Sequence, residues 1–277
     1  MPGITQPFFR LTLTLALTLG AGAAAGYELK GEPVQGGLMF GQALPGSEVT
    51  LDGEAVMVSA DGQFVFGFGR DDAGTVTLQV LEPGTETESV ELTIAAREYN
   101  IERVDGLPPK TVTPDPESLA RIRREGAMVS SARARRDDRT DFADGFTWPA
   151  TGRLSGFYGS QRVLNGEPRR PHFGVDVAAP TGTPVTAPAP GVVTLAEPDL
   201  YYSGGTVVLD HGMGLSSSFL HLSAVDVTVG QDVAQGDLIG KIGATGRATG
   251  PHLDWRMNWL DKRVDPQPLV GEMPARD

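Results

Sequence analysis

The chain has 277 residues, enough for two modest domains behind a leader. Its formal net charge of −12 argues against nucleic acid as a partner, because phosphate binding needs a basic face. The absence of cysteine excludes disulfides, thiol nucleophiles and cysteine metal ligands, so any metal must be held mainly by His, Asp or Glu.

Residues 1–25 have the pattern of a secretory signal peptide. Arg10 gives a positive start, residues 11–19 are apolar apart from threonines, and Ala23 to Ala25 provide small residues for cleavage before Gly26. The apolar run is too short to span a bilayer comfortably, and no later segment is apolar enough to do so. We therefore expect an exported protein with no membrane span after signal cleavage, which in a Gram-negative host means the periplasm.

Residues 26–107 are expected to form a small accessory domain resembling a β-sandwich. Turn signals such as Pro45-Gly46 and Asp61-Gly62 separate short stretches in which polar and apolar residues alternate with period two, as in strands with one buried face. These stretches are 47–51, 63–68, 75–80 and 90–94. The segment has no histidine and no clear cluster of acids, so it is either a positioning or binding module or a spacer that shields the rest.

Residues 108–145 are expected to form a linker that contains a helix. Asp115 can cap the helix and Pro116 suits its first position, so the helix should run from Pro116 to about Arg136. Its arginines could form a basic groove for a cell-wall polymer, but such a run is more often a solvated face, and no function is assigned to it. Short strands rich in Gly, Pro, Val and Thr then predict an all-β domain over residues 146–277.

All four histidines follow residue 171, which concentrates potential metal ligands in the C-terminal domain. His172 and Asp176 are four apart, so in an extended segment both side chains can face one ion, with Gly174 leaving room between them. His252 and Asp254 are two apart, so a strand projects both to one side. Each pair alone is a weak signal, because a histidine near an aspartate on a surface is common.

Taken together, these stretches resemble the lysostaphin-type (LytM) zinc peptidoglycan endopeptidase family over roughly residues 146–268. The matching motifs occur in the order and similar spacing of the family, which makes chance similarity improbable. They are His172-x-Gly174-x-Asp176, Ala179-Pro180-x-Gly182-Thr183-Pro184-Val185, Gly204-Gly205, Asp210-His211-Gly212, Phe219-Leu220-His221-Leu222-Ser223, Val229-Gly230, Gln235-Gly236, Ile239-Gly240, and the run from Thr245 to Leu253.

The resemblance implies that His172 and Asp176 are zinc ligands and that Asp254 occupies the position of the third ligand. It also implies that His221 and His252 assist catalysis; alone, His221 at the end of an apolar strand would be interpreted as a core histidine. His211 would be structural. The family's last motif is His-x-His, so Asp254 is a departure. A carboxylate still binds zinc, but a second one should weaken it as a Lewis acid and could admit manganese more readily.

The implied function is an exported zinc metalloendopeptidase that hydrolyses peptide cross-links or stems in bacterial peptidoglycan. The preferred target is a D,D-bond of directly cross-linked stems. A first alternative is a catalytically degenerate LytM-type regulator that activates other wall hydrolases, which the departure at Asp254 invites. A second alternative is a wall adhesin in which the N-terminal β domain binds carbohydrate. The sequence is silent on protein partners.

Overall fold

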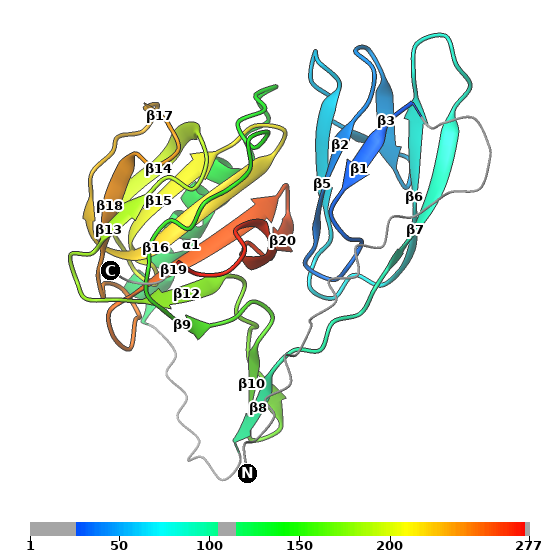
Figure 1. Cartoon of the computed structure of the whole chain (residues 1–277). Helices are drawn as coiled ribbons and strands as arrows, with labels where there is room; N and C mark the ends of the chain where they lie inside the picture. Colours follow the sequence, from blue (N-terminus) through cyan, green and yellow to red (C-terminus); the bar gives the residue numbers. More distant parts are fainter. Residues whose placement is uncertain (1–25, 105–114, 275–277) are drawn as a thin grey trace, which may run out of the picture.

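The computed structural model describes residues 26–104 and 115–274 (Figure 1). The signal peptide expected over residues 1–25 lies outside this part of the chain. Within the described ranges, no helix is long and apolar enough to cross a membrane. The chain is mainly β, as expected from its sequence.

Two antiparallel sheets form the N-terminal part of the molecule. The first has the order β1-β2-β5, with strands Glu28–Lys30, Leu38–Gln42 and Gln63–Gly67. The second has the order β4-β3-β6-β7, with strands Glu54–Val56, Glu48–Leu51, Gly74–Leu81 and Glu88–Ile94. All four expected strands are present within two residues of their expected bounds.

Strand β5 departs from the expected pattern of one buried face. Phe64 and Phe66 lie on one side of β5 and join the same hydrophobic core as Leu78 and Val80 of the second sheet. Val65 points to the opposite side and is also fully buried. Its neighbour across the ladder, Phe40, lies 5.7 Å ring to ring from Phe142, so the outer face of the sheet packs against a later part of the chain.

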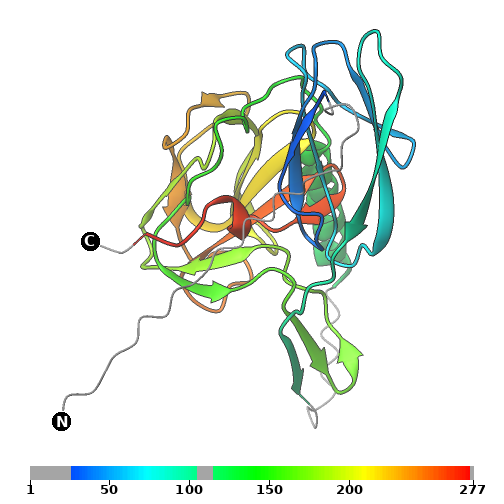
Figure 2. The same cartoon turned by 45° about the vertical axis from the view of Figure 1, so that its right-hand side comes forward.

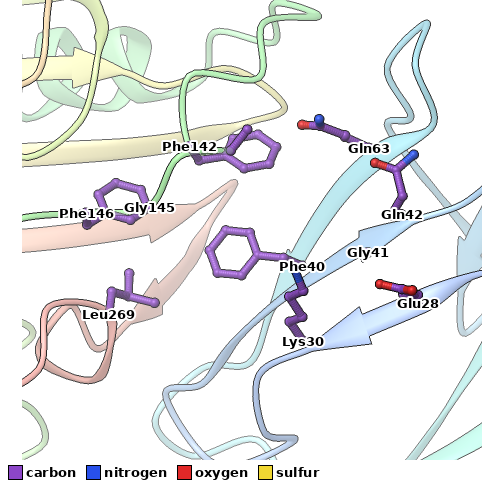
Figure 3. Close-up of a pocket in the computed structure, with 11 residues that line it drawn as sticks. Glu28, Lys30, Phe40, Gly41, Gln42, Gln63, Phe142, Gly145, Phe146 and Leu269 are labelled. Atoms are coloured by element: carbon purple, nitrogen blue, oxygen red, sulfur yellow. The ribbon is translucent and has the colours of Figure 1, made fainter.

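The N-terminal sheets are therefore attached to the C-terminal half. A cavity of about 370 Å³ lies at this contact, with Phe40 on one side and Phe142, Phe146 and Leu269 on the other (Figure 3). Two ion pairs also join the halves: Lys262 Nζ lies 2.8 Å from Asp72 Oδ2, and Arg97 Nη2 lies 2.9 Å from Asp265 Oδ2.

Strand β8 (Ile101–Val104) leaves the N-terminal sheets and pairs in parallel with β10 (Gln161–Leu164). Strand β10 also forms a hairpin with β11 (Glu167–Pro168). This small sheet projects away from the rest of the molecule (Figures 1 and 2). It joins two segments about 60 residues apart in the sequence, which no local pattern indicates.

Helix α1 spans Pro116–Arg133 and begins as expected, because the Asp115 side chain accepts hydrogen bonds from the backbone N–H groups of Glu117 and Ser118. It ends three residues earlier than expected, where the N–H of Ala134 bonds to the carbonyl of Ser131. The helix packs through Ala132 against apolar residues of the large sheet (Figure 1).

A ten-stranded sheet forms the C-terminal part. Its main path has the order β17-β14-β15-β16-β19-β12-β9, with β13, β18 and β20 paired off this path. In this order, the main-path strands are Asp232–Val233, Gly191–Leu200, Gly204–Asp210, Leu215–Val225, His252–Trp259, Val175–Ala178 and Arg153–Gly156. The others are Pro184–Thr186, Leu238–Ile242 and Lys262–Val264, and a 3₁₀ turn follows at Gln267–Leu269.

Asp210 at the end of β15 is a buried carboxyl group that should make the stability of the protein depend on pH. Burial raises its pKa to about 6, Oδ1 accepts from the N–H of Gly212, and Oδ2 has no hydrogen-bond partner. Because the folded-state pKa exceeds the ordinary value, ionisation of Asp210 removes stability as the pH rises from about 4 to about 6.

Asn does not ionise. We therefore expect the unfolding free energy of Asp210→Asn minus that of the wild type to increase by about 2–3 kcal/mol from pH 4 to pH 7. Urea unfolding of both proteins at both pH values measures this difference. Neighbouring His211, whose pKa burial lowers to about 4, has the opposite pH dependence but is present in both proteins. A difference that stays constant with pH would contradict the expectation.

Candidate metal centre

Two neighbouring strands and one loop bring the expected ligands together. Strand β12 pairs with β19 so that Asp176 lies directly opposite Asp254. His172 precedes β12, where its backbone N–H and C=O bond to Ser160 and Gly159. One ligand atom each from His172, Asp176 and Asp254 lies within 4.8 Å of the others. The three residues proposed from the sequence therefore converge.

The donor atoms have the environment that a divalent cation needs. His172 Nε2 and Asp176 Oδ1 are buried and 3.2 Å apart, yet neither has a hydrogen-bond partner of acceptable geometry. Asp254 is only 3% exposed. Burial alone would lower the pKa of His172, but the adjoining carboxylates of Asp176 and Asp254 raise it above its ordinary value. Buried nitrogen and oxygen atoms facing one another without a shared hydrogen bond fit a cation held between them.

Because Gly174 has no side chain, strand β19 and the Asp254 carboxylate can approach its backbone closely. A Cβ at this position would lie 2.4 Å from Trp255 O, 2.6 Å from Arg256 Cγ and 2.9 Å from Asp254 Oδ1. A methyl group therefore cannot fit without moving strand β19.

We expect Gly174→Ala to lower zinc affinity at least tenfold and to destabilise the fold by about 1–3 kcal/mol, because both the backbone and the Asp254 carboxylate must shift. Zinc titration calorimetry and urea unfolding measure the two effects. Gly166→Ala serves as the control for a glycine change with open space at the Cβ position, although its positive φ of 80° adds local backbone strain. Unchanged zinc affinity in Gly174→Ala would contradict this account.

Sequence reasoning missed Arg256, which contacts Asp254 at both carboxylate oxygens. Arg256 Nε lies 2.9 Å from Oδ1 and 3.1 Å from Oδ2, and Nη2 lies 2.5 Å from Oδ2. Burial alone would raise the pKa of Asp254, but the guanidinium charge holds it at about 2. The two residues are two apart on β19, so strand alternation could have indicated that they share a face.

This contact changes the expected charge of the site. His172 is counted as neutral, Asp176 and Asp254 carry −1 each, and Arg256 adds +1, which gives −1 in total. A shell of two neutral histidines and one aspartate has the same total charge. With a metal held by these residues, the neighbouring guanidinium would offset the loss of Lewis acidity expected from the second carboxylate.

His221 and His252 lie side by side next to the three ligands, with ring centroids 4.8 Å apart. His221 Nδ1 lies 2.9 Å from the carbonyl oxygen of Thr245, and His252 Nδ1 lies 2.8 Å from that of Gly250. A carbonyl only accepts, so each Nδ1 carries a proton, and Nε2 is the ring nitrogen left to act as an acceptor. Burial lowers the pKa of His221, which favours its neutral form at pH 7.

His211 lies apart from this group and is fully buried. Nδ1 lies 2.6 Å from the carbonyl oxygen of Pro190, and Nε2 lies 2.9 Å from Ser217 Oγ. Both ring nitrogens are therefore satisfied within the core, as expected for a structural histidine.

The fold is that of a peptidase class, and the chain belongs to peptidase family M23. The family model matches residues 170–266. A crystal structure of a putative M23 peptidase from Pseudomonas aeruginosa is 33% identical, with a TM-score of 0.67 and coverage of 87% of this chain and 96% of that one.

Two curated relatives carry names that describe a role in the cell wall or cell division. The peptidoglycan DD-endopeptidase ShyA of Vibrio cholerae is 42% identical over 111 residues, which are 39% of this chain and 26% of ShyA. The cell division protein DipM of Caulobacter vibrioides is 30% identical over 161 residues, which are 56% of this chain and 25% of DipM. The chain therefore spans about a quarter of the length of these relatives.

Proposed function

We propose that this protein is an exported, metal-dependent endopeptidase that hydrolyses peptide cross-links or stems in bacterial peptidoglycan. One observation carries the proposal: ligand atoms of His172, Asp176 and Asp254 lie within 4.8 Å of one another. Two imidazoles suited to proton transfer lie beside them. Membership of family M23 and the peptidoglycan DD-endopeptidase name of ShyA support this class of substrate, and the same name supports a D,D-bond.

The proposed role of each residue follows from these contacts. His172, Asp176 and Asp254 would hold zinc, which when bound polarises a carbonyl and lowers the pKa of water towards about 7. The Nε2 atoms of His221 and His252 accept a proton from the attacking water and return it to the leaving amine. The carbonyls of Thr245 and Gly250 fix the tautomers required for this role. Residues 146–277 would form the peptidase domain, residues 26–107 the accessory domain and residues 108–145 the linker.

The alternative function is that of a regulator of other wall hydrolases without catalytic activity of its own. It is favoured by one observation: Arg256 contacts both oxygens of Asp254, so one proposed ligand is already engaged. The two candidates differ in whether the purified protein cuts peptidoglycan.

The test is incubation of purified sacculi with the mature chain, with and without one equivalent of zinc. Mass spectrometry identifies the released fragments, and elemental analysis measures bound metal. We expect about one zinc per chain and fragments with newly formed peptide ends. Bound zinc without any released fragment would exclude the peptidase and favour the regulator.

A further inference from the structure

A second pocket, of about 410 Å³, lies between helix α1 and the large sheet, adjoining the candidate metal centre. Its floor includes Leu220, Ser218 and Arg256. In the β16–β19 ladder, Leu220 pairs with Asp254 and Ser218 pairs with Arg256, so the pocket continues along the sheet face that carries Asp254. A peptide bound at the metal centre can therefore extend into it.

Four arginines from four parts of the chain line this pocket. They are Arg133 at the end of α1, Arg170 two residues before His172, Arg256 on β19 and Arg263 on β20. Arg256 is paired with Asp254, but no ion pair involves Arg133, Arg170 or Arg263 within the described residues. Arg263 Nη1 is 3.1 Å from the amide oxygen of Asn258, which carries no charge.

The pocket therefore holds positive charge in excess of negative charge. Burial, followed by the charges of Arg133, Arg256 and Arg170, lowers the pKa of Arg263 to about 9. The one carboxylate on the wall, Glu125, is already engaged, since it pairs with Arg121 and accepts from the N–H of Tyr201. A bound anion would offset this excess of positive charge.

A polar group and apolar walls complete the pocket. Ser218 is 3% exposed, and its hydroxyl has no hydrogen-bond partner. Ile122 and Val129 of α1 face Leu200 and Leu220 of the sheet across the pocket. The lining thus combines guanidinium groups and one free hydroxyl with aliphatic side chains, which suits a residue with an aliphatic stem and an anionic end.

We propose that this pocket binds a free carboxylate of the peptide substrate and so selects acidic peptides for the adjacent metal centre. This inference rests on the proposed function, since it names the substrate feature that the same site recognises. Two observations favour a peptide carboxylate over an extended polyanion: the pocket is small and partly apolar, and the chain as a whole carries a net charge of −12. Arg133 would give helix α1 a role in substrate selection.

The test compares two synthetic tetrapeptides that differ only in whether their side-chain and terminal carboxylates are free or amidated. Calorimetry with the mature chain, kept free of metal by a chelator, measures binding without hydrolysis. We expect the free acid to bind at least tenfold more tightly than the amide. Arg133→Gln and Arg170→Gln should each reduce affinity for the acid at least fivefold and leave affinity for the amide unchanged.

Arg124→Gln is the matched control, because Arg124 is exposed on the same helix and does not line the pocket. Equal binding of acid and amide, or equal losses in Arg124→Gln and Arg133→Gln, would overturn the proposal. If inorganic phosphate, added at the same concentration as the peptide, abolishes the preference for the free-acid peptide over the amidated peptide, the proposal is also overturned. Zinc content of each variant is measured separately, so loss of carboxylate selection is distinguishable from failure of the metal centre.

Discussion

His172→Ala is expected to reduce zinc binding at least 100-fold and peptidoglycan cleavage at least 1000-fold. The imidazole is the single neutral nitrogen donor among the three proposed ligands, and its Nε2 faces Asp176 at 3.2 Å without a satisfied hydrogen bond. Its removal leaves two carboxylates, one of them engaged by Arg256. A 1000-fold loss corresponds to about 4 kcal/mol of transition-state stabilisation, in the range attributed to metal catalysis.

Fragment release from sacculi and zinc content measure these effects in parallel. Asp144→Ala is the control, because Asp144 is exposed and remote from the three ligands in the sequence. Urea unfolding of metal-free His172→Ala shows whether the fold is intact. Equal digestion by His172→Ala and the wild type would rule out the catalytic role of this site.

Asp254→His, which restores the family's histidine at the third ligand position, is expected to weaken zinc binding when made alone. It removes the carboxylate paired with Arg256, whose side chain is 24% exposed, and leaves that positive charge beside the cation site. An unpaired charge in this position is expected to cost about 2–3 kcal/mol of unfolding free energy, after allowance for partial exposure. Repulsion between the guanidinium and zinc should lower affinity at least tenfold.

The double variant Asp254→His with Arg256→Gln should recover most of both losses, since it removes the unpaired charge and provides two neutral histidines and one aspartate. A double-mutant cycle in zinc affinity and in unfolding free energy measures the coupling between the two positions. We expect a coupling of about 2 kcal/mol. Additive effects of the two substitutions would show that Arg256 does not compensate the charge of Asp254.

Much of the local structure can be predicted from the sequence. Alternation with period two identifies strands such as β6 and β7, because each has one side against the core and one towards solvent. Asp115 and Pro116 mark the start of α1, because a cap acts on backbone groups two or three residues away. The spacings within His172–Asp176 and His252–Asp254 likewise act over a few residues, and the family resemblance links these pairs into one site.

Tertiary structure decides what these local elements do together. The pairing of β12 with β19 places Asp176 opposite Asp254 across 78 residues of chain, and helix α1 and β20 bring Arg133 and Arg263 to the same pocket. The sheet that contains β5 packs through Phe40 of β2 against Phe142, far along the chain. The sequence alone thus indicated several of the strands and the helix start, whose signals are local, and through the family resemblance it indicated the candidate ligands. The shared pocket and its excess positive charge arise only when distant segments pack, because electrostatic and hydrophobic interactions depend on distance in space.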